Sequence, residues 1–144
     1  IDYLDAEFGS RALFPTDYPR RLDVLRRAAL AQGLTEKAMR WLLERFRPAE
    51  AQNEVLMRAL ARTVNVTLDA IEGDTPNWSE LSNDAGHIML ASILGYLDFR
   101  FAAIEWRKDR PNLTAWHQDF ALRLSYVNTE FADSLDLAPA PVKV

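Results

Sequence analysis

Several residue types that mark common kinds of site are missing or rare in this chain. It contains no cysteine, which excludes disulfides, thiolate catalysis and cysteine-based zinc sites. It has two histidines, His87 and His117, and neither has the i,i+4 partner that builds a metal site on a helix. Only five glycines occur and no glycine-rich phosphate loop is present, while runs of β-branched residues are almost absent. These absences disfavour metalloenzymes, nucleotide-phosphate binding and β-rich folds.

The residues that are abundant favour one soluble, helical domain. The chain has 144 residues, of which 49% are hydrophobic and 26% charged, as in ordinary globular proteins. Leu, Ala, Arg and Glu dominate, and all four favour helices. The net charge of −4 gives no general attraction to nucleic acid. We therefore interpret the basic cluster of Arg20, Arg21, Arg26 and Arg27 as a solvated helix face, and we expect no nucleic-acid partner.

One apolar stretch, "GHIMLASILGYLDFRFAAIEW" from Gly86 to Trp106, approaches the length of a membrane span. Asp98 and Arg100 in its second half make a span unfavourable, so it is better interpreted as the central helix of a soluble bundle. The two charges cannot face each other because residues two apart point in different directions. Each therefore needs a partner among backbone groups or charges of the next helices; a catalytic role would lack a nearby second acid, base or nucleophile. We expect Gly95 to let a neighbouring backbone approach closely.

Proline, glycine and capping residues divide the chain into segments. Helical spacing of apolar residues predicts a helix from Asp17 to about Pro48 with a bend or short break at Gly33, a helix from Pro48 to Gly73, the buried helix, and a helix from Pro111 to Leu124. Residues 1–16 are predicted to be an incoming linker and the end of a preceding domain. A short terminal helix would place Phe131 and Leu135 over the bundle, and residues 137–144 are predicted to be a flexible tail. The chain has no initiator Met, and we expect it to be a piece of a longer protein.

The remaining candidate residues favour structural roles over chemistry. Asp84 precedes His87 by three residues, which is typical of a helix N-cap with His87 at the third helical position. His117 is predicted to be at the surface or in an interface. The four tryptophans invite an aromatic ligand cage, but they lie on separate segments and are more typical of core or interface anchors. No hydroxyl has the neighbouring base that nucleophilic catalysis requires.

A series of segments in order points to a family. "IDYLDAEFGSRALFPTDYPRR", "LERFRP", "LASILGYLDFRFAAIEWRKDRPNLTAW" and "RLSYVN" together resemble the C-terminal helical domain of bacterial glutathione S-transferases. The resemblance covers nearly the whole chain. Its most specific parts are "LGYLDFR" at 94–100 and the pattern of Pro111, Leu113 and Trp116 in the following helix.

The resemblance implies a fold, a reaction and a division of labour. The fold would be all-α, a bundle of about five to six helices around a buried central helix, in which Asp84, His87, Asp98, Arg100 and Trp116 serve capping and core roles. The parent would be a cytoplasmic homodimer that conjugates glutathione, its co-substrate, to small hydrophobic electrophiles. A thioredoxin-like N-terminal domain would bind glutathione and activate its thiol, so this chain would carry no catalytic residue, cofactor or metal.

In that family the pocket wall comes largely from the first long helix. Ala28, Gln32, Thr35 and Met39 share one face of it and are the candidates for substrate binding, with ordinary packing or solvent exposure as the alternative for each. Many relatives have Asp where this chain has Gln32, which offers no charge to the glutathione of the other subunit. The family also has Ser or Thr at the position of Asp84 and, three residues later, Asp at the position of His87. The alternative function is a non-catalytic helical module for protein–protein association.

Overall fold

The chain folds as an α-helical bundle in a computed structural model that describes residues 1–9, 13–78 and 83–131. Within these ranges there are six α-helices, three short 3₁₀ turns and no strand. The all-α prediction and the predicted number of helices are confirmed. The helices are α1 (Asp2–Glu7), α2 (Tyr18–Arg45), α3 (Glu54–Asp74), α4 (Ala85–Arg100), α5 (Pro111–Ala121) and α6 (Leu124–Val127).

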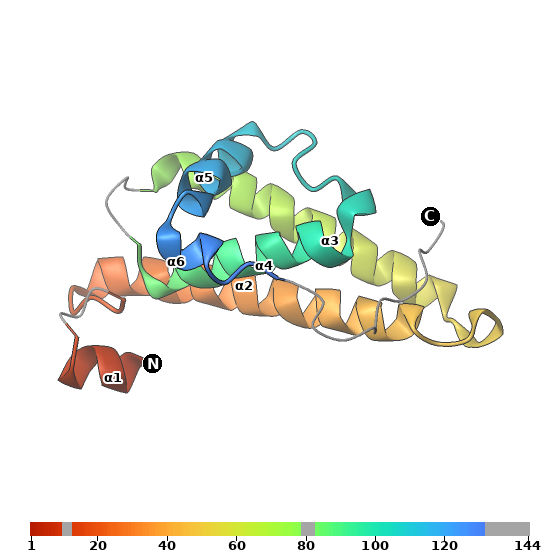
Figure 1. Cartoon of the computed structure of the whole chain (residues 1–144), viewed down its shortest axis with the longest axis horizontal. Helices are drawn as coiled ribbons and strands as arrows, with labels where there is room; N and C mark the ends of the chain where they lie inside the picture. The colour runs from red at the N-terminus through yellow and green to blue at the C-terminus, as the bar shows by residue number, and fades with distance from the viewer. Residues whose placement is uncertain (10–12, 79–82, 132–144) are drawn as a thin grey trace.

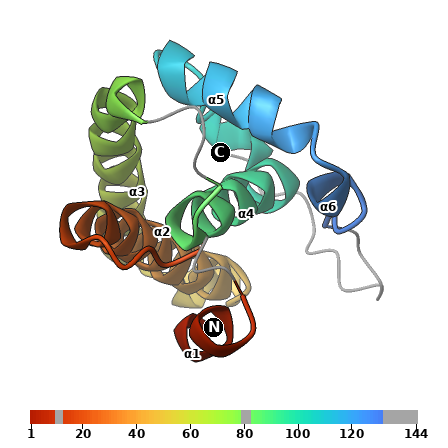
Figure 2. The same ribbon diagram turned by 90° about the vertical axis from the view of Figure 1, so that its left-hand side faces the viewer.

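Helix α4 is the centre of the bundle. Figure 1 shows α2 as the long helix along one side, with α3 returning beside it and α1 set apart next to the first turns of α2. Seen end-on in Figure 2, α4 lies in the middle with α2, α3, α5 and α6 around it. This arrangement follows from the sequence of α4, which is apolar on nearly every face and is therefore stable only when covered on nearly every side.

The hydrophobic core forms where the inner faces of four helices meet. Each fully buried leucine or valine there stabilises the fold by roughly 1.5–3 kcal/mol relative to an exposed side chain. Helices α4 and α2 contribute equally to this core, and the other helices add further apolar residues at helical spacing. The core includes Leu90, Leu94 and Leu97 of α4, Leu34 and Ala38 of α2, Val64 and Leu68 of α3, and Leu113 of α5.

Helix α2 starts as predicted but does not break. Asp17 is its N-cap, accepting a hydrogen bond from the backbone N–H of Arg20 at 3.2 Å. The helix then continues for 28 residues through Gly33, so the predicted bend or break there is wrong. A glycine inside a helix costs about 1 kcal/mol relative to alanine. The buried Ala31 and Leu34 on either side of it outweigh that cost.

At Gly86 the first turn of α4 packs directly against α2. A Cβ atom there would lie 2.7 Å from the Cβ of Arg27 and 2.8 Å from the carbonyl oxygen of Val24. We expected this role for Gly95, where the neighbour is instead the side chain of Tyr126. The first turn of α4 therefore requires a residue without a side chain.

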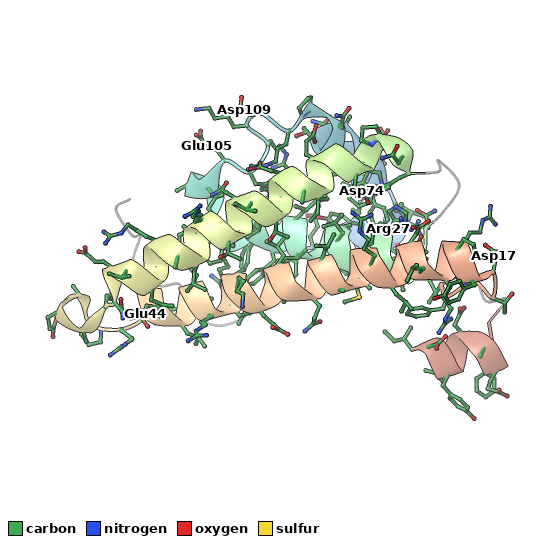
Figure 3. The ribbon with its side chains drawn as sticks, turned by 180° about the vertical axis from the view of Figure 1, so that it is seen from behind. Asp17, Arg27, Glu44, Asp74, Glu105 and Asp109 are labelled. Atoms are coloured by element: carbon green, nitrogen blue, oxygen red, sulfur yellow. The ribbon has the colours of Figure 1, made fainter. Side chains whose placement is uncertain are left out.

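Two helix boundaries differ from the predicted ones. The central helix ends at Arg100, six residues before Trp106, and a 3₁₀ turn follows at Ala102–Ile104. Glu105 and Asp109, labelled in Figure 3, have positive φ values of 46° and 61°, which turn the chain sharply. These left-handed residues are not glycines, so local sequence does not announce them.

The other difference precedes α3, which starts at Glu54. Pro48 is followed by a 3₁₀ turn at Ala49–Ala51, and Asn53 then caps the helix by accepting from the backbone N–H of Leu56 at 3.0 Å. Glu44, labelled at the far end of α2 in Figure 3, closes this connection by accepting from the backbone N–H of Asn53 at 2.7 Å.

The end of the described chain also departs from the predicted pattern. The sequence predicts Leu124 in the amphipathic helix that starts at Pro111, but that helix ends at Ala121 and Leu124 is 79% exposed in α6. Phe131 lies over the bundle, with its ring stacked on that of Phe99 at 6.1 Å. Leu135 and residues 137–144 lie outside the described residues.

Candidate functional site

Asp84 is the N-cap of α4 and ties that helix to α2. One of its carboxylate oxygens accepts from the backbone N–H of His87 at 3.1 Å. The other lies 2.6 Å from Nη2 of Arg27 and 3.1 Å from Nδ1 of His87. Figure 3 shows Arg27 extending from α2 toward the other helices. Because all three side chains are largely buried, this cluster is part of the packing between the helices.

The electrostatics of this cluster keep Asp84 ionised. Burial acts to raise the pKa of its carboxyl group, but the hydrogen bonds and charge of His87 and the charge of Arg27 outweigh burial and lower the pKa. The negative charge also sits at the positive end of the α4 dipole. The imidazole of His87 contacts the capping carboxylate itself.

His87 packs in an aromatic cluster with two of the four tryptophans. Its ring centre lies 5.0 Å from that of Trp78 and 5.6 Å from that of Trp116, and the two tryptophans meet edge to face at 5.0 Å. These segments are far apart in the sequence and are joined here around the start of α4. The geometry is that of packing between aromatic rings.

Asp98 finds its partners in the loop that follows its own helix. It accepts a hydrogen bond from Nε1 of Trp106 at 2.8 Å. It also forms a bidentate ion pair with Arg107, whose Nη2 lies 2.8 Å from Oδ2. The side chain of Asp98 is 37% exposed. The expectation of partners from the next helices is therefore wrong, because the early end of α4 lets the loop fold back over Asp98.

Arg100 has a different environment. Its guanidinium group lies 4.1 Å from the centre of the Phe99 ring, in a cation–π contact. It also acts on Tyr96: burial raises the pKa of that tyrosine, and the charge and hydrogen bond of Arg100 offset part of the rise. Asp98 and Arg100 thus face separate partners, as their spacing requires.

The four substrate-binding candidates form a partly exposed stripe along α2. Ala28 and Thr35 are half-buried, Gln32 is exposed and Met39 is 39% exposed. The amide of Gln32 donates to the carboxylate of Glu36 at 3.2 Å, and the hydroxyl of Thr35 donates to the carbonyl of Ala31 at 2.8 Å. We call these four residues the α2 stripe; they share one helix face, on which Gln32 and Met39 are the exposed members.

A hollow of about 930 Å³ lies elsewhere, between α4, α5 and the segment around α6. None of the residues of the α2 stripe lines it. Its lining includes His117, which is 4% exposed, so the prediction of a surface or interface position for this histidine is wrong. The spacing of Leu113, His117 and Phe120 at i, i+4 and i+7 places all three on the buried face of α5, and this was the signal that could have placed His117.

Arg107, His117 and Tyr126 meet in the lining of this hollow. Nε2 of His117 lies 3.1 Å from the hydroxyl of Tyr126, and Nδ1 lies 3.4 Å from Nη2 of Arg107. Burial is the main cause that lowers the pKa of His117, and the charge of Arg107 lowers it further. The charge of Asp98 and a hydrogen bond to the Ala91 backbone offset part of that change. Burial also raises the pKa of Tyr126. Both groups are therefore held neutral near neutral pH.

The described part of the chain contains no group of three or more His, Asp or Glu side chains placed to hold a metal ion. Among the same residues, no helix is both long and apolar enough to cross a membrane.

Sequence and structure comparisons agree on the family. Residues 84–119, which include the cap of α4 and most of α5, match the family described as Glutathione S-transferase, C-terminal domain. The chain is 30% identical over 132 residues to an uncharacterized GST-like protein, YibF, of Escherichia coli K12. That match covers 90% of this chain and 65% of the relative, so the chain spans just under two thirds of the relative's length.

Two solved structures are similar to the whole helical bundle. A glutathione transferase family member from Pseudomonas fluorescens Pf-5, with bound S-(propanoic acid)-glutathione, superposes with a TM-score of 0.80 at 32% identity, covering 90% of this chain and 67% of that one. A glutathione S-transferase from Methylobacillus flagellatus KT with glutathione bound gives 0.80 at 27% identity, covering 88% and 64%. The chain belongs to the glutathione S-transferase family and is its C-terminal helical domain.

Proposed function

We propose that this domain is the helical half of a cytoplasmic, homodimeric glutathione transferase that conjugates glutathione to small hydrophobic electrophiles. The observation that carries the proposal is the match, at 32% identity and a TM-score of 0.80, to a transferase that holds a glutathione conjugate. In this proposal the thiol-activating residue belongs to a thioredoxin-like half upstream of Ile1. The present chain supplies packing, a pocket wall and surface for the dimer.

The α2 stripe is the proposed wall of the electrophile pocket. Met39 has a flexible, polarisable side chain and Ala28 leaves space, which suits ligands of varied shape. Gln32 stands where many relatives have Asp, and its hydrogen bond holds the carboxylate of Glu36 about one helical turn away. Exposed apolar residues on α2 and α3, such as Leu43 and Val66 at 63% and 58%, offer contact area for the second subunit.

The full gene product tests the function in two steps. We expect it to be retained on glutathione-agarose and to conjugate glutathione to 1-chloro-2,4-dinitrobenzene. In the active enzyme, Ala28→Trp should raise KM for the electrophile by about tenfold, the size expected for losing a few contacts in an apolar pocket, with KM for glutathione unchanged. Arg40→Ala, exposed on the same helix but off the stripe, is the matched control.

Two results would count against the proposal in different ways. A gene product with no thioredoxin-like segment and no retention on glutathione would leave the non-catalytic interaction module as the function. An active enzyme whose electrophile KM is the same in Ala28→Trp and Arg40→Ala would keep the transferase and remove the α2 stripe from its pocket. Sedimentation of the full-length protein as a monomer would refute the dimer.

A further inference from the structure

His117 connects the loop after α4 to the end of the bundle. Its Nδ1 atom lies 3.4 Å from Nη2 of Arg107, and its Nε2 atom lies 3.1 Å from the hydroxyl of Tyr126. The hydroxyl of Tyr126 donates in turn to the carbonyl oxygen of Ala91 in α4, at 3.5 Å. Because His117 is only 4% exposed, these groups take the place of water around its ring.

Arg107 fixes the direction of these hydrogen bonds. An arginine can only donate, so Nδ1 of His117 is the acceptor and the hydrogen of the neutral ring lies on Nε2. That N–H donates to the oxygen of Tyr126, whose own hydrogen goes to Ala91. Burial is the main cause that lowers the pKa of His117, so the ring is neutral near neutral pH. Both ring nitrogens have a fitting partner in this protonation state.

Protonation of His117 would reverse its contact with Arg107. Nδ1 would become a donor that faces the donor Nη2 at 3.4 Å, with a positive charge on each side chain. Arg107 is the partner that can move away, because its side chain is 39% exposed whereas His117 is buried and bonded to Tyr126. The same Nη2 atom lies 2.8 Å from Oδ2 of Asp98, so its movement weakens the ion pair between Arg107 and Asp98.

The other groups around the ring act in the same direction. Asp98 in α4 is the charge that favours protonation of His117, and Arg107 is the charge that opposes it. Tyr126 is neutral, because burial raises its pKa and the charges of Asp98 and Glu130 raise it further. A protonated His117 therefore competes with Arg107 for the negative charge of Asp98.

Arg107 belongs to a short turn whose two ends are anchored. Trp106 and Arg110 are 2% and 7% exposed, and the carbonyl of Trp106 accepts from Nη1 of Arg110 at 2.9 Å. Residues 108–109 between them are exposed. Between these anchors, the ion pair of Arg107 with Asp98 holds the turn against α4.

We propose that protonation of His117 displaces Arg107 from Asp98 and opens the turn at residues 107–109 while the helices stay folded. Arg107 and Asp98 both line the hollow, so the open turn changes the shape of one of its walls. The switch operates below pH 6.5, the ordinary pKa of histidine, because burial favours the neutral ring. It does not depend on transferase activity.

NMR of the isotope-labelled full-length protein follows the titration of the His117 ring and the exchange of backbone hydrogens together. Two amides report on the turn: the N–H of Lys108 donates to the carbonyl of Glu105 at 2.8 Å, and that of Arg110 donates to the carbonyl of Arg107 at 3.1 Å. Between about pH 8 and about pH 4.5, we expect their protection factors to fall about tenfold, with the midpoint of the His117 titration. Amides in the middle of α4 and α5 should keep their protection.

Two variants and a control separate this switch from other effects of pH. In His117→Gln the loss of protection should disappear, because no group titrates at this position. In Arg107→Gln the midpoint of His117 should rise, since the charge that opposes its protonation is gone, and the turn should be poorly protected even at neutral pH. Arg58→Gln removes a charge from the exposed face of α3 and should behave as the wild type.

Four outcomes would each overturn the proposal. Unchanged protection at Lys108 and Arg110 while His117 titrates would show that the turn does not respond. The same pH dependence in His117→Gln would assign it to another group. A His117 ring that stays neutral until the helices also lose protection would make the change global unfolding, and an unshifted midpoint in Arg107→Gln would remove Arg107 from the switch. If His117→Gln does not fold, the wild-type titration and Arg107→Gln still decide the question.

Discussion

The close approach of α2 and α4 at Gly86 makes a sharp prediction about stability. In Gly86→Ala the new methyl group would lie 2.7 Å from the Cβ of Arg27, 2.8 Å from the carbonyl oxygen of Val24 and 3.2 Å from the backbone nitrogen of Ala28. These atoms belong to the backbone of α2 or are fixed directly to it. The helices must therefore separate, or α4 must shift along α2, to admit one methyl group.

The expected loss follows from two opposing terms. Overpacking of this kind costs about 1–3 kcal/mol, and the better helix propensity of alanine returns at most about 1 kcal/mol. We expect Gly86→Ala to lower the free energy of unfolding by about 1–2 kcal/mol. Separation of the helices would also loosen the ion pair between Arg27 and Asp84, which bridges the same two elements.

Gly33→Ala is the matched control for this substitution. A Cβ at Gly33 meets nothing within 4 Å and the residue lies inside α2, so alanine should stabilise the protein by about 0.5–1 kcal/mol. Urea unfolding followed by far-UV circular dichroism gives both values under the same conditions. A Gly86→Ala protein as stable as the wild type, with an unchanged m-value, would refute the close packing of α2 on α4.

Three further predictions concern ionisable groups. Asp98→Ala should lower the free energy of unfolding by about 1–3 kcal/mol because it removes the acceptor of Trp106 and Arg107. An unchanged melting temperature would show that these two contacts of Asp98 contribute nothing to stability. The folded-state pKa of Asp84 is below its ordinary value of 3.8. The ionised carboxylate therefore stabilises the fold above that pH, and this contribution is lost as the pH falls through the lower folded-state pKa. When unfolding is measured at decreasing pH, Asp84→Asn should lose less stability than the wild type. The folded-state pKa of His117 is likewise below its ordinary 6.5, so protonation favours the unfolded chain. The stability of the wild type should therefore fall as the pH drops below 6.5, and that of His117→Gln should fall less.

The helices could be predicted from local sequence because their signals are local. Apolar residues recur at helical spacing in α2, α3 and α5, and Asp17 can be identified as a cap from its position before Tyr18 and Pro19. The all-round apolar character of α4 predicts a central position for it. Each of these signals lies within a few residues of the feature that it defines.

The contacts that make the hollow are not local, and the sequence gives no direct sign of them. His117 meets Tyr126 across the turn that ends α5, and Tyr126 lies over Gly95 from 31 positions further along the chain. The loop that returns Arg107 to Asp98 depends on positive φ at Glu105 and Asp109, where the local sequence offers no glycine. The spacing of the α2 stripe along its helix is a local feature and could be predicted from the sequence. The direction in which the stripe faces depends on contacts between distant segments and could not be predicted.

The continuity of α2 through Gly33 bears on the shape of any ligand that the α2 stripe contacts. Ala28 and Met39 are about 16 Å apart along the helix axis, at about 1.5 Å per residue. Because the helix does not break between them, the four side chains lie in one row along α2. In the proposed enzyme, such a row would contact an electrophile along its length and on one side only. Selection among electrophiles by their outline would then come from the surface that faces α2.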